Sequence, residues 1–255
     1  MPPFLHVINK IIADADIILE VADARFPELS RNIEIEKKVK RAGKPIILVL
    51  NKADLVPAEA ILAAKRRLAH EIPTAFFSSK SKEGLSRLFS LIFSLMGKTE
   101  RACVKVAVCG YPNTGKSSVI NAISGTGKAR TGSKSGLTRG YQYVNARAKI
   151  TLIDTPGIFP FGERDEAKAV LIGAKDFTKI KEPDLAAMEI IQMFLDSHQR
   201  ALEEFYGITI EEEDGYAVLL TIGKARNLLK RGGEVDEHRA GVRVIQDWQL
   251  GKLRL

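Results

Sequence analysis

GYPNTGKSS, residues 110–118, carries two glycines, a lysine and a serine at the spacing G-x-x-x-x-G-K-[ST]. The mostly apolar run 104–109 before it predicts a strand, and the apolar residues of 119–123 after it predict the start of a helix. A glycine-rich turn between a strand and a helix directs backbone N–H groups inward, and the helix N-terminus adds partial positive charge. The stretch therefore predicts a loop that binds phosphate groups.

The polar members of this loop have separate expected tasks. Lys116 would neutralise the β- and γ-phosphates of a nucleotide, and the Ser117 hydroxyl would be a ligand of Mg²⁺. The pattern does not identify the base, so the remaining sequence has to do so. The nucleotide-binding residues expected from the loop are Pro112, Asn113, Thr114, Gly115, Lys116, Ser117 and Ser118.

Composition limits the class of protein. With 255 residues, of which 45% are hydrophobic, the chain can form one large domain or a core of about 150 residues plus a smaller one. Cys103 and Cys109 flank or lie in the predicted strand 104–109, and we expect both to be buried free thiols. Because the sequence holds neither an apolar run of membrane-spanning length nor a signal-peptide pattern, we expect a soluble, cytoplasmic protein without membrane contact.

The charge of the chain is unevenly distributed. Residues 1–159 hold 25 Lys and Arg against 13 Asp and Glu, whereas residues 160–255 hold 14 against 18. A basic surface favours a polyanionic partner, most simply a nucleic acid. A solvated lysine-rich surface would give the same composition, so charge alone leaves both interpretations open.

Strands and helices alternate along the first part of the chain. This alternation predicts a doubly wound, mainly parallel sheet, in which ligands bind beyond the carboxyl ends of the strands. We expect strands at 17–22, 45–50, 74–77, 104–109 and 149–153, and helices at 3–14, at 32–42 with Ser30 as its cap, after Pro57, and at 84–97.

Two polar stretches after predicted strands are suited to bind a guanine base. Asn51, Lys52 and Asp54 form N-K-x-D, in which the carboxylate can accept hydrogen bonds from guanine N1–H and its 2-amino group. Adenine has no donors there and would leave Asp54 unpaired, which is a strong form of discrimination. Asn51 would brace the loop and touch the base, and the Lys52 stem would lie on the ring face. In the second stretch, Ser78, Ser79 and Lys80, backbone N–H groups of Ser79 and Lys80 would face the guanine O6.

A third stretch carries the residues expected around the γ-phosphate. Asp154 ends a predicted strand in D-T-P-G and would hold Mg²⁺ through water, and the Gly157 N–H would contact the γ-phosphate. The polar, basic segment 128–142 has the composition of a switch. Thr138 is the candidate in it for the hydroxyl that closes on Mg²⁺, and Thr131 is the competitor.

The remainder of the chain predicts a helical tail. We expect helices near 165–174, 183–204, 215–231 and 235–249, an exposed acidic loop at 211–214, and a buried Trp248. Leu228 and Leu229 are expected in the core of the third helix, which would also carry four basic residues able to contact phosphates: Lys224, Arg226, Lys230 and Arg231.

Together these stretches resemble the circularly permuted GTPases of the YlqF/RbgA and nucleostemin type. The base-reading motifs at 51–54 and 78–80 precede the phosphate loop, Thr138 and the D-T-P-G motif, which is a rotated order. D-A-R-F-P at 23–27 with S-R-N at 30–32 is similar to a further stretch of that family. The resemblance implies an α/β P-loop GTPase domain at 1–160 and a smaller all-α C-terminal domain at 161–255 that contacts RNA.

The resemblance also implies a function. It indicates a Mg²⁺-dependent enzyme that binds GTP and GDP, hydrolyses GTP and assists assembly of the large ribosomal subunit or its precursor through rRNA, and we expect a monomer. Lys116, Thr138 and Gly157 would be its catalytic residues. Two alternatives remain open: a GTP-sensing scaffold with negligible turnover, and a GTPase that acts on another RNA such as tRNA.

Two residues bear on the hydrolysis rate. Ile158 follows D-T-P-G, where many GTPases have a glutamine that orients water, so we expect a slow intrinsic rate. Asn113 matches an asparagine that binds K⁺ in related GTPases, where the ion supplies positive charge. Asn113 can equally be a turn residue that tolerates a strained loop. Some relatives carry a P-G-H segment whose histidine is a candidate for catalysis. His6 follows Phe4-Leu5 instead of P-G, and we interpret it as an ordinary helix residue.

Overall fold

The chain divides into two compact units, residues 1–163 and 164–255. The computed structural model describes residues 3–68, 70–96, 103–125, 142–146, 150–156 and 166–255. Among these residues, no helix combines the length and the apolar character that crossing a membrane requires.

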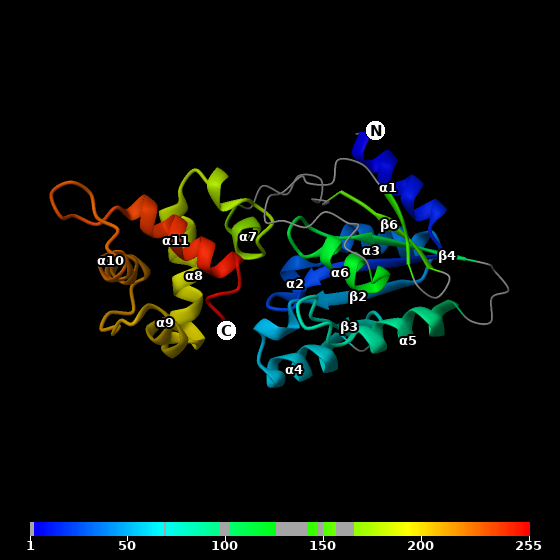
Figure 1. The fold of residues 1–255 in the computed structure, drawn as a ribbon, viewed down its shortest axis with the longest axis horizontal. Coiled ribbons are helices and arrows are strands. Elements are labelled where there is room, and N and C mark those ends of the chain that lie inside the picture. The colour runs from blue at the N-terminus through cyan, green and yellow to red at the C-terminus, as the bar shows by residue number, and fades with distance from the viewer. Residues whose placement is uncertain (1–2, 69, 97–102, 126–141, 147–149, 157–165) are drawn as a thin grey trace. The chain divides into compact units, whose positions relative to one another are not determined.

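A six-stranded sheet forms the centre of the first unit (Figure 1). Its strand order is β3-β2-β1-β4-β6-β5, and every neighbouring pair is parallel except β5 with β6. The sheet is thus mainly parallel and doubly wound, as the sequence predicts. The strands are β1 (Ile17–Asp23), β2 (Ile46–Asn51), β3 (Thr74–Phe76), β4 (Val104–Cys109), β5 (Gln142–Asn145) and β6 (Ile150–Asp154).

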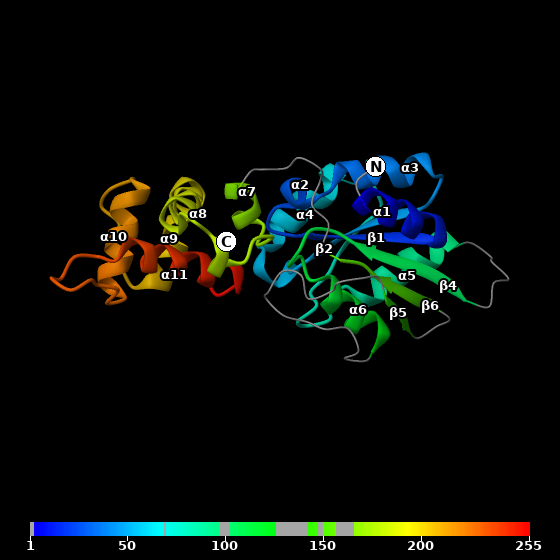
Figure 2. The same ribbon diagram turned by 90° about the horizontal axis from the view of Figure 1, so that it is seen from above.

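Helices cover both faces of this sheet (Figure 2). Apolar side chains of α1, α3 and α4 pack on one face, and those of α5 and α6 pack on the other. β1 and β2 are buried along their whole length, which suits their mainly apolar sequences; Glu20 is the buried polar residue in the middle of β1. The helices are α1 (Pro3–Asp14), α2 (Pro27–Ser30), α3 (Ile33–Arg41), α4 (Ala58–Leu68), α5 (Leu85–Met96) and α6 (Lys116–Ser124), with a 3₁₀ turn at Ala53–Leu55.

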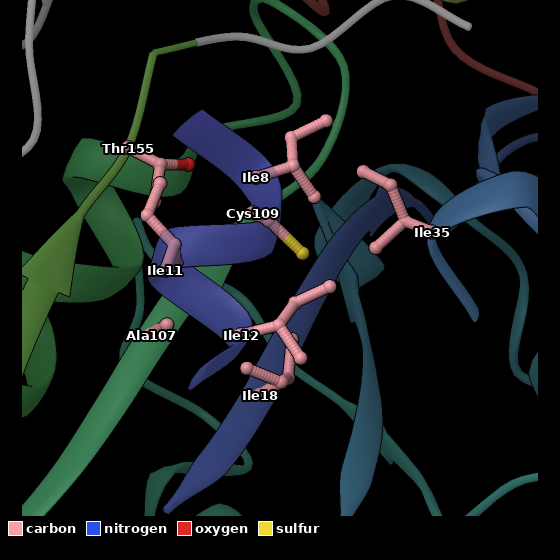
Figure 3. A pocket seen from close by; sticks show the side chains of 8 residues that line it. All are labelled: Ile8, Ile11, Ile12, Ile18, Ile35, Ala107, Cys109 and Thr155. Carbon is pink, nitrogen blue, oxygen red and sulfur yellow. The ribbon is translucent and has the colours of Figure 1, made fainter. Parts of the chain in front are cut away.

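The packing of α1 on the sheet leaves a small hollow, shown in Figure 3. Its lining is almost entirely apolar, and burial there raises the pKa of the Cys109 thiol. The hollow therefore has the character of core packing. The residues that line it are Ile8, Ile11, Ile12, Ile18, Ile35, Ala107, Cys109 and Thr155.

Two local expectations for the first unit are wrong, and one strand was not predicted. The cap of α3 is Asn32, whose side chain accepts from the Ile35 N–H, whereas the Ser30 hydroxyl donates to the Phe26 carbonyl oxygen and ends α2. Cys103 is exposed rather than buried, because it precedes β4. The edge strand β5 was not expected, since its residues QYVN are short, polar and mostly exposed.

The second unit is helical and is held together by an apolar core. Trp248 is fully buried, as predicted, and its indole N–H donates to the Leu171 carbonyl oxygen at 2.8 Å. The Phe194 ring packs edge-on against Trp248, with 5.7 Å between the ring centroids. The helices are α7 (Glu166–Leu171), α8 (Pro183–Ser197), α9 (Gln199–Tyr206), α10 (Gly215–Ala225) and α11 (Glu237–Gln249), with a 3₁₀ turn at Phe177–Lys179.

Two tail helices differ from their predicted extents. The helix predicted at 183–204 divides at His198, which ends α8 and begins α9. The helix predicted at 215–231 ends at Ala225, because Arg226 is its C-cap and Asn227 has a φ of 53°.

The chain after α10 forms a turn closed by an antiparallel bridge between Leu229 and Val235. Lys230 and Arg231 therefore lie outside the helix that holds Lys224, and the predicted basic cluster on one helix is wrong. Leu228 and Leu229 are half-buried in this turn and are not core residues of a helix. The acidic loop at 211–214 is exposed, as predicted.

Candidate nucleotide-binding site

The predicted ligand loops follow strands at the centre of the sheet. β1 and β4 are neighbours at the centre of the sheet. From β1 the chain adds β2 and β3 on one side, and from β4 it adds β6 and β5 on the other. In open parallel sheets this switch in direction leaves a crevice beyond the carboxyl ends of the strands, where ligands bind. The loops at 51–54, 78–80 and 110–118, together with Asp154, all follow strands whose carboxyl ends meet at this edge.

The backbone of the phosphate loop depends on its two fixed glycines. Gly110 has a φ of 136°, and a Cβ there would lie 2.2 Å from the Val21 carbonyl oxygen of the adjacent strand. Gly115 has a φ of 95° and immediately precedes α6. Side chains are excluded at both positions by conformation and by space, so the loop curls tightly ahead of a helix N-terminus.

Lys116 reaches back over the loop that it follows. Its Nζ donates to the Tyr111 carbonyl oxygen at 2.6 Å, and only 7% of the residue is exposed. Burial lowers the pKa of the ammonium group to about 8, and the charge of Asp154 opposes this shift. An ammonium group poised in this way is suited to exchange a carbonyl oxygen for a phosphate oxygen.

Asp154 ends β6 and lies beside Val108 in the register of the sheet. Its carboxyl group is buried, and its Oδ1 has no hydrogen-bond partner among the residues that the structure describes. Burial raises the pKa of Asp154, while the neighbouring Lys116 charge opposes the shift. A buried carboxylate oxygen without a partner is costly unless a ligand or water satisfies it.

These residues fit Mg²⁺. The metal commonly uses one or two protein oxygens together with water and phosphate oxygens. Within the described ranges there is no cluster of three His, Cys, Asp or Glu residues that could hold a metal ion without a nucleotide. Asp154, whose Oδ1 accepts no hydrogen bond from the described part of the chain, and the Ser117 hydroxyl at the start of α6 are therefore the residues that would hold Mg²⁺ at bound phosphates.

Asn51 connects two of the predicted loops. Its Nδ2 donates to the Thr114 carbonyl oxygen at 2.8 Å, and its Oδ1 accepts from the Ser79 N–H at 3.1 Å. The first bond requires Gly115, because a Cβ at that position would lie 2.1 Å from Asn51 Nδ2. Asn51 thus braces the phosphate loop and the 78–80 loop against each other. The sequence predicts a bracing role within its own loop, and the contact of Asn51 with the base stays a prediction.

The acceptor predicted for guanine is exposed at the same edge. Asp54 lies in the turn after β2, and its Oδ1 accepts from the Ser78 hydroxyl at 2.7 Å. Ser78 is buried, Ser79 is half-buried and Lys80 is exposed. The carboxylate is therefore oriented by a buried hydroxyl and remains accessible to a ligand.

Lys52 takes part in a contact that the sequence did not indicate. Its Nζ lies 2.7 Å from Asp23 Oδ2, and Arg25 binds the same carboxyl group. Asp23 is fully buried at the end of β1 and is the register partner of Asn51. The available sequence signal was an aspartate at the end of a buried strand, but its pairing with Lys52 depends on the strand register.

The remaining predicted residues fall into two groups. In the phosphate loop, Pro112 and Thr114 are buried, whereas Asn113, Ser117 and Ser118 are half-buried. Asn113 has a φ of 60°, as expected of a residue that tolerates a strained turn. The residues that lie outside the described ranges are Thr131, Thr138, Gly157 and Ile158.

Comparison with known sequences gives GTP-binding proteins. A family described as 50S ribosome-binding GTPase matches residues 105–221. The chain is 42% identical, over 98% of its length, to an uncharacterized GTP-binding protein of Methanocaldococcus jannaschii, of which it spans 66%. It is 34% identical, over 96% of its length, to nuclear/nucleolar GTPase 2 of Arabidopsis thaliana, of which it spans 42%. The chain is thus shorter than the relatives it matches.

Comparison with solved structures identifies the permuted fold. The structure of YlqF from T. maritima bound to GNP matches with a TM-score of 0.64 at 20% identity, covering 98% of this chain and 94% of YlqF. The GDP-bound structure of YlqF matches with a TM-score of 0.65 at 22% identity, covering 97% of this chain and 95% of YlqF. The rotated motif order, the sheet topology and the homologous GTP-binding proteins agree, and the chain belongs to the family of circularly permuted GTPases.

Proposed function

We propose that this chain binds GTP and GDP with Mg²⁺, hydrolyses GTP and acts in assembly of the large ribosomal subunit. The observation that carries the proposal is the Asn51 bridge, because one side chain joins the base-reading loop to the phosphate loop. A nucleotide must contact both loops at once, so their connection indicates a site for the whole molecule. The family membership supports the same conclusion.

Guanine would be selected by the turn after β2. The Asp54 carboxylate, oriented by Ser78, would accept from guanine N1–H and the 2-amino group. The Lys52 stem would cover the ring face, and the backbone N–H groups of Ser79 and Lys80 would face O6. Asp54 would be left unpaired by adenine, so selection follows from the cost of an unsatisfied carboxylate.

Phosphate binding and hydrolysis would involve separate groups. Lys116, the loop N–H groups and the N-terminus of α6 would hold the phosphates, and Ser117 and Asp154 would hold Mg²⁺. The metal ion, when bound, would neutralise charge that develops on the phosphate oxygens. Thr138 and Gly157 are proposed to complete this arrangement around the γ-phosphate.

The expected rate is slow. Ile158 has no group that can hydrogen-bond an attacking water, so we propose that stimulation comes from a partner or from K⁺ held near Asn113. The same isoleucine favours a second candidate function, a GTP-sensing scaffold with negligible turnover. An RNA partner other than rRNA, such as tRNA, would be compatible with the basic composition of residues 1–159.

The large ribosomal subunit is the partner that the family supports best. The family that matches residues 105–221 is described as 50S ribosome-binding GTPase, and one relative is named nuclear/nucleolar GTPase 2. Residues 1–159 are basic, and a basic surface is attracted to the phosphate backbone of rRNA. We propose that both units contribute to this contact.

The proposal is tested by nucleotide selectivity and turnover. GTP and ATP are compared at equal Mg²⁺ in binding and phosphate-release assays, with Lys116→Ala as the control for contaminating activity. Binding and hydrolysis of GTP that exceed those of ATP, and that are lost with Lys116→Ala, would support the proposal. Tight GTP binding without phosphate release would favour the scaffold, and equal binding of GTP and ATP would contradict the guanine assignment.

A further inference from the structure

The stretch D-A-R-F-P with S-R-N, residues 23–32, has no task in the proposed function. It begins at the carboxyl end of β1, and Asp23 is directly beside Asn51 in the register with β2. The Ala24 N–H donates to the Asn51 carbonyl oxygen at 2.8 Å, so the two strand ends are fixed to each other. This places Asp23 next to the base-reading loop.

Asp23 lies at the centre of a closed polar network. Its Oδ2 accepts from Lys52 Nζ at 2.7 Å and from an Arg25 guanidinium nitrogen at 2.9 Å, and its Oδ1 accepts from Arg25 Nε at 3.1 Å. Its N–H donates to the Ser30 hydroxyl oxygen at 2.9 Å. Arg25 and Ser30, from the same 23–32 stretch, thus hold the carboxyl group and the backbone of Asp23, and Lys52 joins them from the end of β2.

In this network each charged group stabilises its partners, because water is largely excluded from them. The Asp23 and Arg25 side chains have no exposed surface, and the Lys52 side chain is 19% exposed. Burial alone would raise the pKa of Asp23, but the Arg25 and Lys52 charges hold it well below its usual range. Burial lowers the pKa of Lys52, and the Asp23 charge opposes that shift. An unpaired ammonium group at this position would be costly.

The backbone conformation of Lys52 helps to fix the direction of its side chain toward Asp23. Lys52 has a φ of 63°, which is left-handed, and the chain turns there from β2 into the turn that carries Asp54. With both the backbone and the ammonium group fixed, the aliphatic stem between them has little freedom. The position of the stem is thus set before a nucleotide binds.

We infer that Asp23 is a positioning residue of the guanine site, which holds the Lys52 ammonium group so that the stem is ready to cover the base. The inference rests on the proposed function, which places this stem on the ring face. It assigns a purpose to the D-A-R stretch: the carboxylate acts on the base through Lys52, and Arg25 is a second cation bound to the same carboxyl group. Preorganisation of this kind raises affinity by removing an ordering cost from binding.

The test is a double-mutant cycle measured with mant-GDP, a fluorescent form of GDP, on the full chain. Asp23→Asn should weaken binding by about 10- to 100-fold, because a charge-assisted hydrogen bond that fixes a ligand-contacting side chain is lost. Lys52→Met keeps an unbranched apolar stem but has no ammonium group to position. In the Lys52→Met background, Asp23→Asn should therefore change affinity by less than about twofold.

Arg25→Gln is the matched control, because it removes the other cation and leaves the Lys52 contact in place. Its affinity for mant-GDP should stay within about twofold of the unchanged chain, although thermal unfolding should show a loss of stability. If Asp23→Asn does not fold, the Lys52→Met single variant and the double variant still give the comparison. A weaker double variant overturns the inference, and equal affinities support it where Lys52→Met itself binds mant-GDP more weakly than the unchanged chain.

Other outcomes separate this inference from the proposed function. Additive losses for Asp23→Asn and Lys52→Met, or an Arg25→Gln loss as large as that of Asp23→Asn, would show that Asp23 does not act through Lys52. Normal binding by Asp23→Asn would overturn the inference and leave the proposed function standing. Failure of the unchanged chain to bind mant-GDP would overturn both.

Discussion

At the scale of the residue, buried charges occur in pairs at the carboxyl edge of the sheet. Lys116 is near Asp154 beside the phosphate loop, and Lys52 contacts Asp23 beside the base-reading loop. Each carboxylate makes a buried ammonium group tolerable, and each ammonium group belongs to a predicted nucleotide motif. In the proposed function, Lys116 would meet the phosphates of the nucleotide, and the stem of Lys52 would meet its base.

Under the proposed function, Asp54 is the residue that selects the base. Asp54→Asn replaces one carboxylate acceptor by an N–H donor, which suits the C2 carbonyl of xanthine and repels the 2-amino group of guanine. Affinity for GDP should fall by about 10- to 150-fold, since each hydrogen bond to a charged group is worth about 1.5–3 kcal/mol. Titration with GDP and with xanthosine diphosphate (XDP) measures the change. If the Asp54→Asn variant still preferred GDP, Asp54 would not be the acceptor for guanine.

Lys116 gives the site a pH dependence. Burial lowers the pKa of its ammonium group to about 8, and an unfolded lysine titrates near 10.5. Between these values the unfolded chain holds a proton that the folded chain has lost, so the Lys116 contribution to the free energy of unfolding increases with pH. Phosphates require the charged form, and GDP affinity should therefore decrease above pH 8, by at most about tenfold per pH unit.

The measurement for this prediction is GDP titration from pH 6.5 to 9.5 in the unchanged chain and in Lys116→Gln. The variant should bind more weakly and lose the decrease above pH 8, because the titrating group is absent. A decrease of equal size in both proteins would assign the effect to another group.

Single residues of the site were predictable to different degrees. Lys116, Ser117, Asn51 and Asp54 follow from motifs, because their chemistry is local to one loop. The pairing of Asp23 with Lys52 joins residues on two strands and depends on the register of β1 with β2. Sequence spacing does not encode that register, so the contact required the structure.

At the scale of the element, strands were predictable where burial is uniform. β1, β2 and β4 are nearly continuous apolar runs between turn residues, and the sheet class followed from their alternation with helices. β5 lies at the sheet edge, and it is short and polar, so no periodicity marks it. The end of α10 was also missed, because Arg226 and Asn227 stop the helix within a sequence that otherwise favours it.

The contact between α8 and α11 depends on a glycine. A Cβ at Gly241 would lie 2.5 Å from backbone atoms of Pro183 and Asp184, so the helices approach closely only without a side chain there. Gly241→Ala should lower the free energy of unfolding by about 1–3 kcal/mol through overpacking. This loss should appear even though alanine favours a helix by about 1 kcal/mol over glycine.

Urea unfolding measures this effect, and Gly215→Ala is the control. Gly215 starts α10, and a Cβ there would lie 3.3 Å from the Met188 carbonyl oxygen, which a small shift can accommodate. Gly241→Ala should be clearly less stable than Gly215→Ala. Equal stability of the two variants would mean that the α8–α11 contact is not limited by this glycine.

At the scale of the whole molecule, permutation changes the order of the motifs without changing the sheet edge where they meet. The base-reading loops precede the phosphate loop in sequence, yet Asn51 and Thr114 are joined by a hydrogen bond across 63 positions. The family match begins at residue 105, in the strand before the phosphate loop, and leaves Asn51 and Asp54 on its N-terminal side. A parallel sheet allows this rotation because every strand delivers its loop to the same edge.

The central claim is that the chain hydrolyses GTP in response to the large ribosomal subunit. The most direct test is the rate of GTP hydrolysis with and without purified large subunits, in KCl and in NaCl. We expect a slow basal rate, stimulation by subunits and a larger stimulation in KCl. Tight GTP binding without stimulation in either salt would contradict the claim and would leave the scaffold or another RNA partner in its place.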